Sequence, residues 1–217
     1  MTDTNLGTSI NSLKDYTIQM IEKCQDALQK SVNSMVEHDI KLANEVIEND
    51  KYINDLRDKI REKSIELFAL KQPMAKDLRY VYSLAIISNE LERIGDYAVN
   101  ISKETIKIGS KPHMKPLVDI PKMSKKCEEM LHETKEALKN EDSKLSKAII
   151  KKDDIVDDLH KQVGKDCLEI MKKDSSLISQ GVQFLYIARH LERSGDHITN
   201  ICEHIIYIVD GKMVELG

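Results

Sequence analysis

The chain has 217 residues, of which 32% are charged and 4% are aromatic, and it contains no tryptophan. This composition favours long amphipathic helices over sheets, and the length allows one or two compact domains. The net charge of −4 argues against nucleic acid as the main partner, because nucleic acid is bound by a clustered basic surface. One basic stretch, residues 103–115, is spread over a predicted helix end and a loop, and we interpret it as solvated.

Targeting and membrane-spanning segments are not apparent in the sequence. The first residues lack the basic start and apolar run of a signal peptide, and no apolar stretch approaches the ~20 residues that cross a bilayer. The four cysteines form no Cys-x-x-Cys pair, which is typical of buried or idle thiols in a reducing compartment. We therefore expect a cytoplasmic protein without a membrane span.

Three long helices are predicted in the first half of the chain. In the first helix, apolar residues recur at helical spacing from Ile10 to Val32. Asp39 can cap the second helix, which Gln72 and Pro73 end. The third helix is predicted over residues 75–108. Helices of roughly 25 to 30 residues are about 40 Å long, which suits a helical bundle.

Prolines mark the boundary to the second half. Pro112, Pro116 and Pro121 are three of the four prolines in the chain, and they predict a linker over residues 111–121. Because prolines disrupt regular hydrogen bonding, a cluster of them separates helical units.

The second half repeats the order of the first. Helices are predicted over residues 117–138, 143–171 and 176–209. The side chains that can cap the last two helices are Asp142 or Ser143, and Ser175 or Ser176.

An eleven-residue signature occurs twice, 100 positions apart: LERIGDYAVNI at residues 91–101 and LERSGDHITNI at residues 191–201. Seven of the eleven positions agree, which indicates an internal duplication. We therefore predict an all-α fold of two tandem three-helix bundles, with six long helices, over residues 1–110 and 117–217.

Each signature places two acids four residues apart, followed four residues later by an amide. Residues at this spacing share one helix face, where like charges repel by about 0.2–0.5 kcal/mol, and a bound cation would offset that repulsion. A second pair of oxygen-bearing side chains at the same spacing lies on the preceding helix of each half. The candidate metal ligands are Asp50, Asn54, Glu92, Asp96, Asn100, Asp153, Asp157, Glu192, Asp196 and Asn200.

The acids of each signature lie opposite the apolar stripe of their own helix, at about 100° per residue. The companion pairs, which begin at Asp50 and Asp153, also lie to the side of their stripes. This arrangement predicts an outer groove with acids on both walls. A solvated face explains the same pattern, because Arg93 and Arg193 can form weak exposed ion pairs with the nearby aspartates.

Gly95 and Gly195 stand next to the acids, inside predicted helices, where glycine costs about 1 kcal/mol relative to alanine. Their presence indicates either that a group approaches the helix backbone closely or that two helices cross tightly there. The sequence does not separate these two explanations.

Carboxylate and amide oxygens favour hard cations such as Mg, Ca, Mn or ferric iron over a closed structural zinc site. His160, His197 and His204 could add a mixed ligand set near the second signature, but we interpret them as surface residues. Glu129 and His132 form one Glu-x-x-His motif, whereas a di-metal carboxylate oxidase needs two that face a bundle interior. The sequence has no phosphate-binding loop and no nucleophile-and-base pattern, so we predict a protein that is not an enzyme.

Both signatures, together with QPMAKDLRYV at residues 72–81 and the ending NICEHIIYIVDGK, resemble the PhoU family of phosphate-uptake regulators along essentially the whole chain. The resemblance implies a cytoplasmic, non-enzymatic regulator that binds multinuclear iron or zinc clusters through Glu/Asp-x-x-x-Asp motifs on the bundle surface. The corresponding pairs in this chain are Glu92 with Asp96, Glu192 with Asp196, Asp153 with Asp157, and Asp50 with Asn54.

Two residues of the first half depart from that family pattern. Asn54 is a weaker ligand than a carboxylate, and Arg57 stands where the family often has an acid. Both changes leave the first-half site less acidic than the second.

The resemblance implies as partners the ATPase subunit of the phosphate ABC transporter and the sensor histidine kinase of phosphate signalling. It further implies a homodimer that acts as a negative regulator, keeping the kinase in its repressing state and restraining uptake when phosphate is plentiful. Two alternatives stay open: a metal-dependent enzyme, and a helical interaction module whose acids contact a basic partner without metal.

Overall fold

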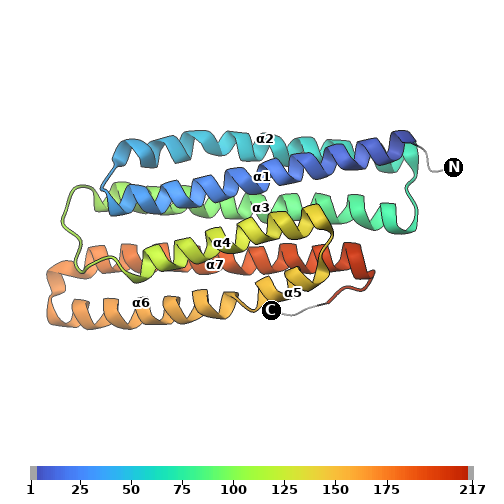
Figure 1. Cartoon of the computed structure of the whole chain (residues 1–217). Helices are drawn as coiled ribbons and strands as arrows, with labels where there is room; N and C mark the ends of the chain where they lie inside the picture. Colours follow the sequence, from blue (N-terminus) through green and yellow to red (C-terminus); the bar gives the residue numbers. More distant parts are fainter. Residues whose placement is uncertain (1–3, 215–217) are drawn as a thin grey trace.

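The computed structural model describes residues 4–214, and every regular element within them is helical (Figure 1). The predicted all-α fold is therefore confirmed. Within the same residues, no helix combines the length and the apolar character that crossing a bilayer requires. The elements are α1 (Thr4–Val36), α2 (Ile40–Lys71), α3 (Ala75–Ile108), α4 (Asp119–Asn140), α5 (Ser143–Ile150), α6 (Asp153–Lys173), the 3-10 turn η1 (Ser175–Leu177) and α7 (Ile178–Asp210).

Short polar side chains and left-handed residues set the helix ends. Asp39 accepts a hydrogen bond from the backbone N–H of Leu42 (2.9 Å) and caps α2, as predicted. Gln72 has a φ of 44° at the end of α2, and the proline after it cannot continue the helix. Asp142 caps α5 in the same way as Asp39. Asp174, and not the predicted Ser175 or Ser176, caps the turn before α7.

The helix predicted over residues 143–171 is interrupted. At Lys151 and Lys152 the chain changes to hydrogen bonds between residues three apart, from Lys152 N to Ile149 O (2.8 Å) and from Ile155 N to Lys152 O (3.1 Å). These tighter bonds separate α5 from α6. The apolar periodicity continues across the turn, so it could not reveal the break.

The predicted linker is shorter than its prolines suggest. Gly109 ends α3 with a φ of 65°, and α4 begins at Asp119, so Pro121 lies in the first turn of a helix. Proline is tolerated there because the N–H that it lacks would have no partner within the helix.

The helices run side by side along one direction (Figure 1). The first bundle contains α1, α2 and α3, and the second contains α4, α5, α6 and α7. Along the middle of the molecule, α3 packs against α7 and α1 packs against α4, while α2 and α6 lie at opposite edges. The two bundles therefore meet over long helix faces and not only at the linker.

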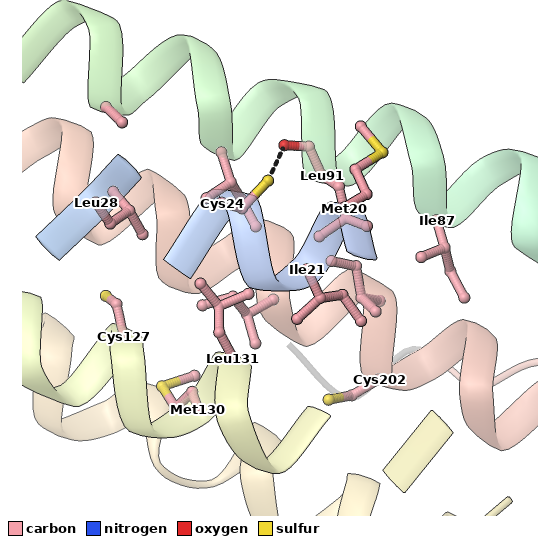
Figure 2. Packing of buried hydrophobic residues seen from close by; sticks show 14 of the residues in the cluster. Met20, Ile21, Cys24, Leu28, Ile87, Leu91, Cys127, Met130, Leu131 and Cys202 are labelled. Carbon is pink, nitrogen blue, oxygen red and sulfur yellow. Dashed lines mark hydrogen bonds between the residues drawn. The ribbon is translucent and has the colours of Figure 1, made fainter. Parts of the chain in front are cut away.

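One hydrophobic cluster runs through both bundles. Figure 2 shows side chains of this cluster from α1, α3, α4 and α7 around Ile21 and Leu131, both of which are fully buried. Buried apolar side chains contribute the main stabilising term in such a fold, at about 25 cal/mol per Å² removed from water. Neither bundle has a separate core.

The two signatures cross in the centre of the molecule, on α3 and α7. His197 of the second copy hydrogen-bonds to Glu90 (Nδ1 to Oε2, 2.7 Å), and His190 stacks on Tyr97 of the first copy, with ring centroids 5.6 Å apart. Burial favours a raised pKa for Glu90, but hydrogen bonds from His197 and Asn200 outweigh it and lower that pKa. Polar pairs thus fix the register of the two helices.

Because the two bundles share one core, we expect urea unfolding followed by circular dichroism to show a single transition. Leu131→Ala should lower the free energy of unfolding by about 2–5 kcal/mol without splitting that transition, since it leaves a cavity between the bundles. The exposed Lys125→Ala should change it by less than about 0.5 kcal/mol. Two separate transitions, only one of which moves in Leu131→Ala, would contradict a shared core.

Candidate functional site

In each half, the acids of the signature lie next to the companion pair on the preceding helix. The first acid cluster, between α2 and α3, consists of Asp50, Asn54, Glu92 and Asp96. The second acid cluster, between α6 and α7, consists of Asp153, Asp157, Glu192 and Asp196. The two clusters belong to opposite bundles and have the same place in each.

The glycine of each signature makes the close approach possible. A Cβ on Gly195 would lie 2.1 Å from Asp153 Oδ1, and one on Gly95 would lie 3.1 Å from Asp50 Oδ1. The side chain of Ile53 lies just as close, with its Cδ1 atom 3.1 Å from a Cβ on Gly95. Both explanations of these glycines are therefore correct, because the helices cross tightly and a carboxylate lies at the crossing.

The acids are less exposed than a solvated helix face would be. The side chains of Glu92 and Glu192 are 18% and 14% exposed, whereas Asp96 and Asp196 lie nearer the rim, at 41% and 37%. Beside Asp50, a hollow of about 230 Å³ opens between α1, α2 and α3. The prediction of acids facing one another across two helices thus agrees with the structure, but the inner acids are half-buried.

Burial and mutual repulsion disfavour ionisation in the second acid cluster. Burial, reinforced by the charges of Asp157, Asp196 and Glu192, raises the pKa of Asp153 to about 7. Burial and the charge of Asp196 also raise the pKa of Glu192. The charges of Arg189 and Arg193 oppose this shift at Glu192 without reversing it.

The second acid cluster fits a hard cation in its chemistry. Asp153 Oδ1 and Glu192 Oε2 are buried oxygens without a hydrogen-bond partner, and such atoms are costly unless something satisfies them. Oxygen ligands with excess negative charge suit divalent cations such as Mg, Mn or Ca, and ferric iron. Within residues 4–214, no three His, Cys, Asp or Glu side chains are already arranged to hold a metal ion, so binding would require the carboxylates to turn toward it.

The first acid cluster is more fully compensated. Arg57 of α2 forms an ion pair with Glu92 of α3, and Asn54 donates a hydrogen bond to Asp50 Oδ2 (2.7 Å). Burial and the neighbouring acids still raise the pKa of Asp50, and its Oδ1, which faces Gly95, has no partner.

Arginines on the signature helices also contact both clusters. Arg93 reaches Asp96 at 3.5 Å, and Arg193 reaches Asp196 at 2.9 Å. Arg189 contacts Glu192 at 2.5 Å. All three arginines are 44–62% exposed, and exposed pairs between neighbouring turns contribute little.

The amides of the predicted ligand set lie elsewhere. Asn200 donates to Glu90 Oε2 (2.9 Å) at the α3–α7 contact, and Asn100 lines a shallow hollow with Tyr186 of α7. Each step of four residues turns a helix by about 40°, so two steps carry the amide round toward the neighbouring bundle. The structure does not bring either amide to the carboxylates.

A buried thiol lies behind each signature. Cys24 Sγ is 3.2 Å from the carbonyl oxygen of Leu91 (Figure 2), and Cys127 Sγ is 3.5 Å from that of Leu191. Burial raises the pKa of both thiols, which keeps them protonated. All four cysteines are buried, and they act as small core side chains, as predicted.

The histidines near the second signature differ from their surface interpretation. His197 is only 19% exposed and bonded to Glu90, and the Nδ1 of His204 is buried. His160 lies close enough to Glu192 to influence its pKa. Of the Glu-x-x-His motif, His132 is exposed and Glu129 pairs with Lys126, so the motif does not face the bundle interior.

Sequence reasoning did not identify Glu90 or Arg189, and it named His160 as a possible ligand near the second signature but interpreted it as a surface residue. Glu90 and His190 precede the two signatures at equivalent positions, and this difference between otherwise similar copies was the available signal. His160 stands 103 residues after Arg57, the same offset that relates the companion pairs. Comparison of the copies at that offset would have placed it beside the second cluster.

Comparison with known proteins identifies related sequences and folds. The sequence model described as the PhoU domain matches residues 17–105 and 120–205. The chain is 35% identical over 200 residues to the phosphate-specific transport system accessory protein PhoU homolog of Clostridium acetobutylicum, covering 92% of this chain and 88% of the relative. It is 32% identical over 206 residues to PhoU of Escherichia coli K12, covering 95% and 86%.

Two solved structures share the fold. The crystal structure of the phosphate transport system regulatory protein PhoU from Streptococcus pneumoniae superposes with a TM-score of 0.91 at 27% identity, covering 97% of this chain and 100% of that one. The crystal structure of PhoU from Pseudomonas aeruginosa gives the same TM-score at 28% identity, covering 95% and 99%.

In the presence of a chelator, Asp153→Asn should raise the melting temperature at pH 8. The pKa of Asp153 in the folded protein, about 7, is above the value in the unfolded chain. The ionised Asp153 therefore destabilises the folded state, and this effect is complete above pH 7. It disappears as the pH falls through 7 toward 4, because the carboxyl group becomes protonated. The advantage of the variant should therefore shrink between pH 8 and pH 5, measured by differential scanning fluorimetry. Asp158→Asn, at an exposed position of the same helix, should show no such trend. A pH-independent advantage would exclude this origin.

Proposed function

This chain belongs to the PhoU family, and from that premise we propose that it is a metal-binding accessory protein of a phosphate-specific transport system that regulates phosphate uptake and phosphate signalling. The family membership rests on the domain match over both halves and on relatives that are more than 30% identical over most of the chain. Those relatives are named as accessory proteins, which supports a role without catalysis.

The second acid cluster carries the metal part of the proposal. It gathers four carboxylates from two helices, two of its oxygens are buried without a hydrogen-bond partner, and the pKa of Asp153 is raised to about 7. Iron, zinc, manganese, magnesium or calcium would supply positive charge there when bound. The four carboxylates would hold the cation, with Glu192 and Asp196 on α7 and Asp153 and Asp157 on α6.

Cation binding would have a structural effect on the second bundle. It offsets the repulsion between α6 and α7 and thereby stabilises their contact, since a ligand that binds only the folded state adds RT ln(1 + [L]/Kd) to stability. Of these two helices, α6 forms the edge of the molecule that is farthest from α2, and α7 lies between α6 and α3 (Figure 1). We propose that this edge presents its ordered form to partners only when the cation is bound.

The proposed partners are the ATPase subunit of the phosphate ABC transporter and the sensor histidine kinase of phosphate signalling. In this proposal the protein acts in the cytoplasm as a homodimeric negative regulator when phosphate is plentiful. The names of the relatives, which tie those proteins to phosphate transport, support the transporter as a partner. The kinase and the dimer rest on the family resemblance of the sequence.

A di-metal carboxylate enzyme is the less favoured function. Such enzymes gather their ligands in a bundle interior, whereas the acids here lie on the flank of each bundle and the Glu-x-x-His motif is at the surface. An interaction module that works without metal remains the alternative that experiment must separate.

Replacing ligands of the second acid cluster should remove metal and weaken partner binding. Asp157→Asn with Asp196→Asn should reduce the metal retained after loading with Mn²⁺ by at least about tenfold, measured by elemental analysis, because fewer charged oxygens remain. Binding to the purified ATPase subunit, measured by biolayer interferometry, should fall in the same variant.

The matched control is Asp154→Asn with Asp158→Asn, which removes the same charge from two exposed positions of α6. It should retain both metal and partner. Unchanged metal in the ligand variant would overturn the metal proposal, and partner binding that survives chelation at full strength would favour the metal-independent module.

A further inference from the structure

The two acid clusters differ at equivalent positions of the duplication. An offset of 103 residues relates Asp50 to Asp153 and Asn54 to Asp157, and the same offset relates Arg57 to His160. All of these residues lie on α2 or α6, the helices that face the signatures. One half therefore carries an arginine where the other carries an imidazole.

Arg57 lies inside the first acid cluster. Its guanidinium forms an ion pair with Glu92 across the two helices and also contacts Asp58 at 3.0 Å. The side chains of Arg57 and Glu92 are only 21% and 18% exposed, so solvent screens this pair less than the pairs at the rim. A guanidinium stays protonated and has no lone pair to offer. It therefore cannot ligate a metal, and its positive charge cannot be removed by deprotonation.

Asn54 completes the compensation in the first acid cluster. Its amide donates a hydrogen bond to Asp50 Oδ2 at 2.7 Å, which takes one more oxygen out of reach of a cation. Asp50 Oδ1 remains without a partner, but a hard cation needs about six oxygen ligands, including waters. Asp50 and Glu92 are thus each bound by a side chain of α2, and Asp96 is contacted by the exposed Arg93 at 3.5 Å.

The second acid cluster has no such internal cation. Asp157 contributes a carboxylate where the first cluster has an amide, and His160 is close to Glu192 where the first cluster has Arg57. An imidazole nitrogen can ligate a metal. Arg189 contacts Glu192, and Arg193 contacts Asp196, but both arginines are on α7 itself and are 44% and 46% exposed. The buried Oε2 of Glu192 accepts no hydrogen bond, and Arg193 Nε lies 3.8 Å from it.

From this difference we propose that Arg57 is a built-in cation that closes the first acid cluster to metal, so that the chain takes a divalent cation at the second acid cluster only. This inference rests on the proposed metal binding by the second cluster. It means that the first bundle is compensated at all metal concentrations and that only the second bundle responds to metal.

An exchange of side chains between the two clusters tests this proposal. Mn²⁺ alone is titrated by isothermal calorimetry, and retained metal is counted by elemental analysis. In an otherwise unchanged chain, Glu192→Gln with Asp196→Asn should abolish Mn²⁺ binding. Glu92→Gln with Asp96→Asn should leave the amount of bound Mn²⁺ unchanged. Asn54→Asp with Arg57→His, which gives the first cluster the side chains of the second, should increase the bound Mn²⁺ about twofold. His160→Arg should weaken binding by at least about tenfold.

A readout without metal protects the test against misfolded variants. In a chelator, Arg57→His should lower the melting temperature by about 2–4 °C, since Glu92 loses its partner, and added Mn²⁺ should restore it in the variant that also carries Asn54→Asp. Arg61→His, at an exposed position one turn further along α2, is the matched control and should change neither quantity.

The outcomes separate this inference from the proposed function. If Glu92→Gln with Asp96→Asn lowers the bound Mn²⁺, or if the Asn54→Asp, Arg57→His variant gains none, Arg57 does not close the first cluster and the inference is wrong. If the wild type binds no Mn²⁺, the metal proposal for the second cluster fails, while a gain by the exchanged variant still supports closure by Arg57.

Discussion

Antiparallel packing of α3 against α7 is the constraint on which the rest of the molecule depends. The two signatures cross there, Glu90 bonds to His197, and Tyr97 stacks on His190. Because these contacts pair one copy with the other, the two bundles are held in one register and share one hydrophobic core. Each of the two helices then has its opposite flank free to face α2 or α6, and that flank carries the acids.

The acid clusters result from a conflict between packing and charge. A glycine in each signature lets a neighbouring helix come close, and the closeness partly buries an aspartate against the helix backbone. Burial and like charges raise the pKa of Asp50 and Asp153, so each cluster is destabilised as long as no cation compensates it. Acids kept in such a place at a cost in stability are typical of a binding function.

The duplicated halves share the same helix arrangement around the acid cluster, but substitutions give the two clusters different charges. Arg57 and Asn54 compensate the first cluster from within, whereas Asp157 and His160 leave the second one short of positive charge. The same comparison explains the centre of the molecule, where Glu90 and His190, and likewise Tyr97 and His197, differ between the copies and meet as complementary pairs. Divergence between copies is therefore informative wherever the fold brings the two copies, or their neighbouring helices, into contact.

The sequence by itself determined the helical class, most helix ends, the internal duplication and the carboxylates of both clusters. Those features depend on local periodicity, on caps such as Asp39 and on spacings along one helix, all of which are local in the chain. Only the tertiary structure decided which side chains share a cluster, because a turn of about 40° per four residues moves Asn100 and Asn200 to a different helix neighbour. It also decided the burial of the acids and the ion pair of Arg57 with Glu92, since these depend on distances between helices that no single-helix pattern contains. The break at Lys151 and Lys152 appeared only in the structure because the apolar periodicity continues across it.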